Sequence, residues 1–112
     1  MTALEATTAG NRGSHNRKLN VDYIKNSVLP LAFYSQELQG LQLNQHGWND
    51  GGLCPFHADT KAGSFKVNLE TGSFICFACG VKGGDIVAFT MALHGLDFVE
   101  ALKKLYVDWG LR

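Results

Sequence analysis

The sequence lacks any hydrophobic run long enough to cross a bilayer or to form the core of a signal peptide. It also lacks net charge, because ten Lys and Arg balance ten Asp and Glu, so the overall composition indicates neither a nucleic-acid nor a membrane partner. Cysteine is scarce and odd in number, and three cysteines fit a reducing compartment better than a disulfide framework. These absences predict a cytoplasmic protein with no membrane partner, on which any basic surface has to be local.

The cysteines that are present all belong to two short motifs. One motif runs from Cys54 to His57 and the other from Cys76 to Cys79, each with two residues between its end positions. This spacing lets a backbone knuckle turn two side chains onto one metal, and two knuckles complete a tetrahedral shell. We therefore predict one structural zinc ion, held by Cys54, His57, Cys76 and Cys79.

A metal would also compensate for the small size of the protein. The 112 residues allow one domain, and a domain of this length buries little surface. Structural zinc contributes about 10–16 kcal/mol in finger peptides, which is enough to decide whether such a fold forms.

Three other kinds of site share parts of these motifs. A redox dithiol at Cys76 and Cys79 would be expected within a βαβ pattern, but a short hairpin precedes it. An iron–sulfur centre is less natural with one histidine among four ligands. His57-Ala58-Asp59 partly matches the H-x-E motif of zinc deaminases, but the acidic residue is Asp and not Glu. Cys54 would also fill the coordination position that a catalytic zinc keeps open for water.

The order of elements predicts an α+β zinc ribbon, with a small antiparallel sheet between N-terminal and C-terminal helices. Residues 1–19 are expected to form a disordered tail, and residues 20–112 the domain. One helix should start after Asn20 and a second at Pro30, where Leu31, Tyr34 and Leu38 share a face. Residues 41–53 indicate an irregular approach to the first knuckle, with a tight turn at Asp50-Gly51 and Trp48 as its bulky anchor.

The second half of the chain shows a hairpin and two more helices. Alternation predicts a strand over 64–68, a turn at Glu70 to Gly72 and a returning strand over 73–77. Residues 80–84 are expected to be a flexible link, followed by a helix from Asp85 to Gly95. A capping box at Asp97 and Glu100 predicts a final helix. Its core-facing residues should be Phe98, Ala101, Leu102, Leu105 and Trp109.

These motifs together resemble the Cys-His-Cys-Cys zinc-binding domain at the front of bacterial and phage DNA primases. The resemblance covers about residues 53–105 and departs from the family pattern at Ala62-Gly63, where Thr-Pro is usual, and at Ile75, where a polar residue is common. The segments that carry it are Gly52 to His57, Ser64-Phe65, Cys76 to Gly80, Gly83 to Ile86, and Phe98 to Leu102.

The resemblance implies a domain without catalysis of its own, because no acidic cluster for magnesium follows the zinc motifs. It implies zinc-dependent binding of a single-stranded DNA template in support of primer synthesis, beside a separate primase, polymerase or helicase. A protein-interaction adaptor of a replication complex, with little DNA binding of its own, is the alternative. The chain could also be an excerpt of a longer primase.

Contact with DNA would need basic and aromatic side chains near the knuckles, because three thiolates leave the zinc site with a net charge of about minus one. We expect Lys61, Lys66 and Lys82 to reach one groove and to contact phosphates. Phe56 and Phe77, inside the knuckles, are candidate platforms for unpaired bases. The competing interpretation is that both rings pack around the zinc site and that the lysines are only solvated.

Overall fold

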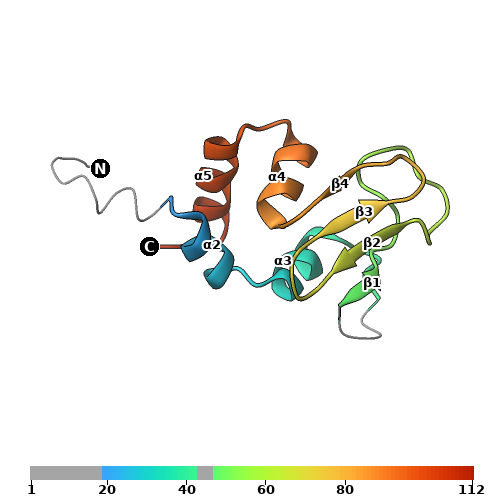
Figure 1. The fold of residues 1–112 in the computed structure, drawn as a ribbon, viewed down its shortest axis with the longest axis horizontal. Helices are drawn as coiled ribbons and strands as arrows, with labels where there is room; N and C mark the ends of the chain where they lie inside the picture. Colours follow the sequence, from blue (N-terminus) through green and yellow to red (C-terminus); the bar gives the residue numbers. More distant parts are fainter. Residues whose placement is uncertain (1–18, 43–46) are drawn as a thin grey trace, which may run out of the picture.

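The computed structural model describes residues 19–42 and 47–112. The predicted disordered tail therefore lies almost entirely outside the described residues. Within them, helices and an antiparallel sheet occur in the order that the predicted α+β fold requires (Figure 1), and none of these helices is long and apolar enough to cross a membrane. The helices are α2 (Val21–Ser27), α3 (Pro30–Glu37), α4 (Ile86–His94) and α5 (Phe98–Asp108), and the strands are β1 (Trp48–Asp50), β2 (Phe65–Asn68), β3 (Phe74–Cys76) and β4 (Lys82–Gly83).

Helices α2, α4 and α5 gather at one end of the molecule, and the sheet forms the other end with α3 beside it (Figure 1). The four strands follow the chain order, β1-β2-β3-β4, and each neighbouring pair is antiparallel. The hairpin of β2 and β3 is the one that the alternation predicted.

Helix starts agree closely with the local sequence signals. The side chain of Asn20 accepts hydrogen bonds from the main chain at the start of α2, and Asp85 does the same for α4. The predicted capping box of Asp97 and Glu100 is present at α5, and Gly95 ends α4 in the left-handed conformation. These residues fix the starts of α2, α4 and α5 and the end of α4, whereas α3 begins at Pro30 without a side-chain cap.

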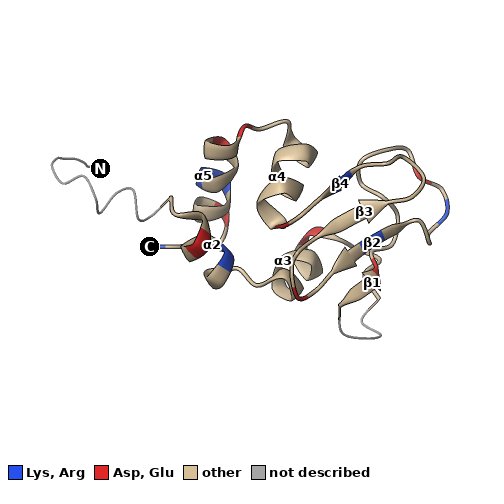
Figure 2. Ribbon diagram, viewed as in Figure 1, with Lys and Arg blue, Asp and Glu red and all other residues tan. Residues whose placement is uncertain are grey.

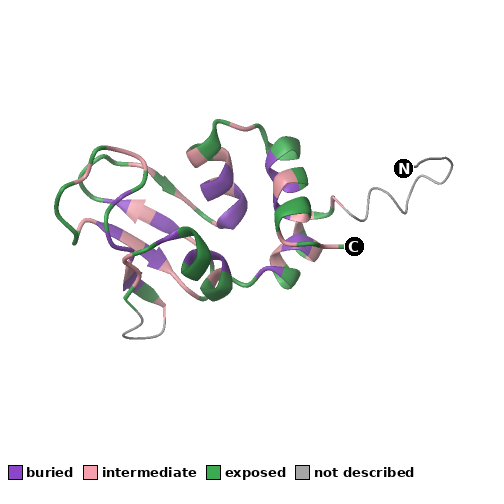
Figure 3. Ribbon diagram, turned by 180° about the vertical axis from the view of Figure 1, so that it is seen from behind, coloured by how far each residue is buried: buried purple, intermediate pink, exposed green. Residues whose placement is uncertain are grey.

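The core is centred on the ring of Phe89, on α4. Figure 3 shows that buried positions concentrate on the strands and on α4. Phe89 is 1% exposed and makes aromatic contacts with α3, with the inner face of the sheet and with the first knuckle. The centroid distances are 5.5 Å to Phe33, 5.3 Å to Tyr34, 5.2 Å to Phe56, 6.5 Å to Phe65 and 5.3 Å to Phe74.

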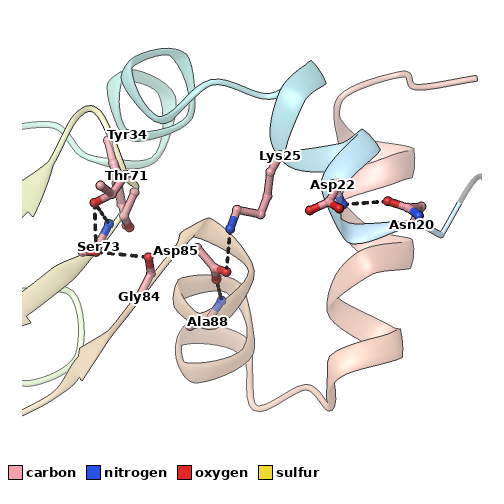
Figure 4. Close-up of polar contacts among 10 residues, drawn as sticks. Asn20, Asp22, Lys25, Tyr34, Thr71, Ser73, Gly84, Asp85 and Ala88 are labelled. Carbon is pink, nitrogen blue, oxygen red and sulfur yellow. Dashed lines mark hydrogen bonds and ion pairs between the residues drawn. The ribbon is translucent and has the colours of Figure 1, made fainter.

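Polar contacts join α2 to the start of α4, and the start of α4 to the sheet. Lys25 of α2 forms an ion pair with the capping residue Asp85, with 3.3 Å between Nζ and Oδ2 (Figure 4). In the same view, Ser73 donates to the carbonyl of Gly84 at 3.1 Å, so the β2–β3 turn is tied to the start of α4.

Two strands were not predicted. Residues 48–50 form β1 instead of an irregular approach, and Lys82-Gly83 form β4 within the segment predicted to be a flexible link. Both are short strands that pair with a neighbour, at Asn49 to Val67 and at Gly83 to Phe74. Three and two residues are too few to show an alternation pattern, so pairing with the central hairpin decides their conformation.

Two predicted core positions, Leu31 and Phe98, are wrong, and Trp48 is more exposed than its predicted role as an anchor implies. Leu31 is 47% exposed, because α3 turns Phe33 and Tyr34 towards Phe89 instead. Phe98 is 47% exposed at the start of α5, and Trp48 is 43% exposed on the outer face of the sheet. The other residues of the predicted α5 stripe, Ala101, Leu102 and Leu105, are buried, and Trp109 packs against them as a partly buried residue.

Candidate metal centre and outer sheet face

The first knuckle follows β1 and is held against the loop after α3. Gly52 has φ 83°, and a Cβ there would lie 2.7 Å from the main-chain Cα of Gly40, so this position requires glycine. The main-chain N–H of Phe56 donates to Sγ of Cys54 at 3.4 Å. The chain therefore turns tightly around the sulfur and brings His57 to the same side.

The second knuckle is the end of β3. Cys76 pairs with Phe65 in the sheet, and its carbonyl accepts from the N–H of Gly80 at 2.8 Å, closing the turn that contains Cys79. The N–H of Cys76 donates to the carbonyl of Val81 at 2.9 Å, which leads the chain into β4. The sheet thus fixes one ligand directly, and the turn places the other.

The two knuckles bring all four predicted ligands together. One donor atom from each of Cys54, His57, Cys76 and Cys79 lies within 4.8 Å of the others, and Sγ of Cys54 is 3.9 Å from Sγ of Cys79. Cys54 and Cys76 are buried, His57 is partly buried and Cys79 is exposed. Three sulfurs and an imidazole at this separation suit a closed tetrahedral zinc shell.

The histidine supplies an independent test of this fit. Nδ1 of His57 is buried and has no hydrogen-bond partner among the described residues. A buried polar atom without a partner is costly, and a metal ion would satisfy it. Nδ1 therefore fits the role of fourth ligand, beside the three sulfurs.

The thiols differ in how readily they ionise before metal binds. Burial raises the pKa of Cys54 to about 12, so this thiol keeps its proton near neutral pH. For Cys76, burial acts in the same direction, but the N–H groups of Cys79 and Ala78 outweigh it and lower the pKa. Zinc binding therefore has to displace at least the proton of Cys54.

A carboxylate lies next to the first knuckle. Oδ2 of Asp59 accepts the N–H of Cys54 at 2.8 Å, and Oδ1 lies 3.6 Å from Nε2 of His57. The N–H of Cys54, followed by smaller contributions that include His57, lowers the pKa of Asp59. From the sequence, Asp59 was expected only as a candidate catalytic acid, whereas in the structure it bonds to Cys54 and lies close to His57.

The comparison with protein families decides the identity of this centre. The sequence model of the CHC2 zinc finger family matches residues 20–112, which is most of the chain. The chain belongs to the CHC2 zinc finger family. With its Cys-His-Cys-Cys group, this CHC2 zinc finger has the donor set for one structural zinc ion, as the spacing predicted.

Several similar proteins are DNA primases. The chain is 48% identical over 92 residues to the DNA primase of Streptomyces coelicolor and 49% identical over 65 residues to that of Listeria monocytogenes. These matches cover 82% and 58% of this chain but only 14% and 10% of the relatives. The chain thus matches one small part of each primase.

A solved structure supports the same fold. The crystal structure of the Aquifex aeolicus primase, with its zinc-binding and RNA polymerase domains, superposes on this chain with a TM-score of 0.65 and 26% sequence identity. The superposition covers 85% of this chain and 22% of the primase chain. The zinc ribbon α+β fold predicted from the sequence is therefore confirmed.

The outer face of the sheet in this CHC2 zinc finger carries a groove of about 1030 Å³. Lys66 and Lys82 lie on either side of Ile75 in the strand register, and all three side chains line the groove. Figure 2 shows the two basic positions on β2 and β4. Trp48 and Phe77, which are 43% and 71% exposed, add aromatic surface to the same groove.

The remaining predicted DNA contacts lie elsewhere. Lys61 is exposed on the loop after His57 and does not line this groove. The ring of Phe56 faces the core, stacked on Phe74 with centroids 5.6 Å apart and contacting Phe89 at 5.2 Å. Trp48 and Ile75 were missed as groove residues, although the alternation over 73–77 already placed Ile75 opposite Phe74 and Cys76.

Proposed function

We propose that this CHC2 zinc finger holds a single-stranded DNA template across the outer face of its sheet and supports primer synthesis carried out elsewhere. The catalytic step would belong to a separate primase, polymerase or helicase component, and this domain would not be catalytic. The groove between Lys66 and Lys82 is the observation that carries the proposal. The similarity to DNA primases supports the setting in replication.

The groove combines the two kinds of group that single strands require. The ammonium groups of Lys66 and Lys82 would contact phosphates, and the exposed rings of Trp48 and Phe77 would stack on bases. Aromatic stacking accepts any base and contributes about 1–3 kcal/mol per base in single-strand binders. The proposal therefore predicts binding with little sequence preference.

Electrostatics explain why the lysines matter in a protein of zero net charge. A zinc ion with three thiolates carries a net charge of about minus one, so the metal centre itself would repel phosphate. Lys66 forms a long ion pair with Asp50, 3.9 Å between Nζ and Oδ2, on the outer face of the sheet. Such a partly exposed pair is weak, and a phosphate can compete for the lysine.

The position of Phe56 reduces the number of aromatic rings that could stack on bases. Because the ring of Phe56 packs against Phe74 and Phe89, we assign Phe56 to the core and, of the two knuckle phenylalanines, Phe77 to base stacking. Lys61 would contact the strand only where it leaves the groove at the metal end. The deaminase reading is not supported, since Sγ of Cys54 lies within the four-ligand group and fills the position that a catalytic zinc needs for water.

The test is a titration of a fluorescently labelled oligonucleotide, followed by anisotropy at several salt concentrations. The parent is compared with three variants, which are Lys66→Ala/Lys82→Ala, Lys61→Ala and Phe77→Ala. The control is Lys103→Ala/Lys104→Ala on α5, which removes the same number of positive charges as the groove double variant. In a plot of the logarithm of the binding constant against the logarithm of the salt concentration, removal of two phosphate contacts should reduce the steepness of the slope by about 1.4. Curves that are identical for parent, control and groove variants would overturn the proposal.

An adaptor role is favoured by one observation. Phe98, Val99 and Val107 of α5 are 47%, 48% and 73% exposed, which is a large apolar exposure for one helix. If oligonucleotide binding is undetectable while a replication polymerase or helicase is recovered with the zinc-loaded protein, the adaptor replaces the template-binding proposal.

A further inference from the structure

We propose that Asp59 is a positioning residue of the metal centre, whose carboxylate lies beside both ligands of the first knuckle and favours Nδ1 of His57 as the nitrogen that binds the metal. One oxygen accepts the main-chain N–H of Cys54 at 2.8 Å. The other lies 3.6 Å from Nε2 of His57. A single side chain thus hydrogen-bonds to one ligand of this knuckle and lies close to the other.

The carboxylate of Asp59 influences which nitrogen of the imidazole carries the proton. A neutral histidine carries one N–H, and only the nitrogen without the proton can bind a metal. A carboxylate oxygen beside Nε2 favours the proton on that nitrogen and leaves the lone pair on Nδ1. Nδ1 is the buried atom of His57 that has no hydrogen-bond partner within the described part of the chain.

The carboxylate of Asp59 also holds the backbone of the first knuckle. Asp59 is two residues beyond His57 and bonds back to Cys54, so its carboxylate closes the loop that contains both ligands. Its oxygen atoms do not belong to the group of four donor atoms within 4.8 Å. Asp59 therefore acts through His57 and Cys54 rather than as a ligand, in the way that outer carboxylates orient histidines at other metal sites.

Zinc affinity, measured by competition with a chromophoric chelator, tests this role. The variants are Asp59→Ala, which removes both contacts, Asp59→Glu, which keeps the charge, and Glu37→Ala on α3, which removes an exposed carboxylate as a control. Loss of an outer partner typically weakens metal binding by about 10–100-fold, and we expect Asp59→Ala to fall in this range. Asp59→Glu should restore most of the affinity, and Glu37→Ala should match the parent.

Asp59→Asn separates the two contacts. Its amide oxygen can still accept the N–H of Cys54, but its NH₂ group would then face the N–H of the imidazole. Two donors cannot form a hydrogen bond with each other, so the contact with His57 becomes unfavourable. We expect Asp59→Asn to lose nearly as much affinity as Asp59→Ala. Parent-like affinity in Asp59→Asn would show that only the bond to Cys54 matters and would overturn the role assigned through His57.

Nitrogen NMR of the zinc-loaded protein provides a readout that stability alone would not change. In the parent, the imidazole signals of His57 should show a proton on Nε2 and a metal on Nδ1. Asp59→Ala and Asp59→Asn should show faster solvent exchange of that proton. Unchanged His57 signals together with weaker zinc binding would overturn the proposal, and neither measurement depends on DNA binding.

Discussion

The hydroxyl of Tyr34 donates a 2.6 Å hydrogen bond to the carbonyl of Gly72, and this bond joins helix α3 to the turn between β2 and β3. Tyr34 is fully buried, and its ring also packs against Phe33 and Phe89. The turn that it holds precedes β3, which carries Cys76 to the metal centre. One buried polar contact thus connects the N-terminal helices to the zinc ribbon.

Replacing Tyr34 by Phe should keep the packing and remove this bond. The carbonyl of Gly72 would lose its buried donor, and an unsatisfied buried acceptor costs about 1–3 kcal/mol. Urea unfolding of the zinc-loaded protein should show this decrease with an unchanged m-value. A free energy of unfolding equal to that of the parent would mean that the bond contributes nothing.

The same residue predicts a pH dependence. Burial, followed by the charge of Asp85, raises the pKa of Tyr34 above its ordinary value of 10.0. The folded state then keeps the phenol proton at a pH where the unfolded chain loses it, so stability falls as the pH rises above about 10. The difference in unfolding free energy between the parent and Tyr34→Phe should shrink by up to about 1.4 kcal/mol per pH unit above that point. A difference that is constant from pH 9 to 11 would contradict this expectation.

Local signals in the sequence were sufficient for the parts of the fold that depend on neighbouring residues. The capping side chains Asn20, Asp85 and Asp97 each start a helix where expected. The alternation from Phe65 to Cys76 gave the central hairpin, and the doubled ligand spacing gave the metal centre. For the caps, the hairpin and each separate knuckle, the residues that determine the structure lie within about a dozen positions of one another.

The remaining features depend on contacts between distant segments. Strand β4 exists because Lys82 and Gly83 pair with β3, and no pattern of two residues could predict that. The outward orientation of Leu31 follows from the contact of Phe33 with Phe89, 56 positions further along the chain. The assembly of one groove from Lys66, Lys82 and Trp48 likewise needed the order of strands in the sheet.

Gly83 should tolerate no side chain. A Cβ at this position would lie 2.5 Å from Cε1 of Phe74 and 2.9 Å from Cβ of Ala88. Because Phe74 is buried against Phe89, its ring cannot move freely, and Gly83→Ala should cost about 1–3 kcal/mol through overpacking. Thermal unfolding checks this, with Gly84→Ala as a control, since a Cβ at Gly84 meets nothing within 4 Å. Equal melting temperatures for the two variants would contradict the prediction.

The two knuckle phenylalanines should behave differently. Phe56→Ala removes a ring that contacts Phe65, Phe74 and Phe89, and it should destabilise the domain by about 3 kcal/mol. Phe77→Ala removes a ring that is 71% exposed, and its effect on stability should stay within about 0.5 kcal/mol. Chemical unfolding of both zinc-loaded variants checks the contrast, and a larger loss for Phe77→Ala would show that the assignment of the two rings is reversed.

Removal of zinc should unfold the sheet end of the molecule. Cys54 and Cys76 are 3% and 0% exposed and belong to the same core as Phe65 and Phe74, so the knuckles and the hairpin should lose their order together. Freshly purified protein should contain one zinc per chain, and excess chelator should abolish the near-ultraviolet circular dichroism of the aromatic core. Returning zinc should restore the signal in the parent but not in Cys76→Ser. Because structural zinc contributes about 10–16 kcal/mol in finger peptides, native-like spectra and hydrogen exchange after complete removal of the metal would be incompatible with a structural role.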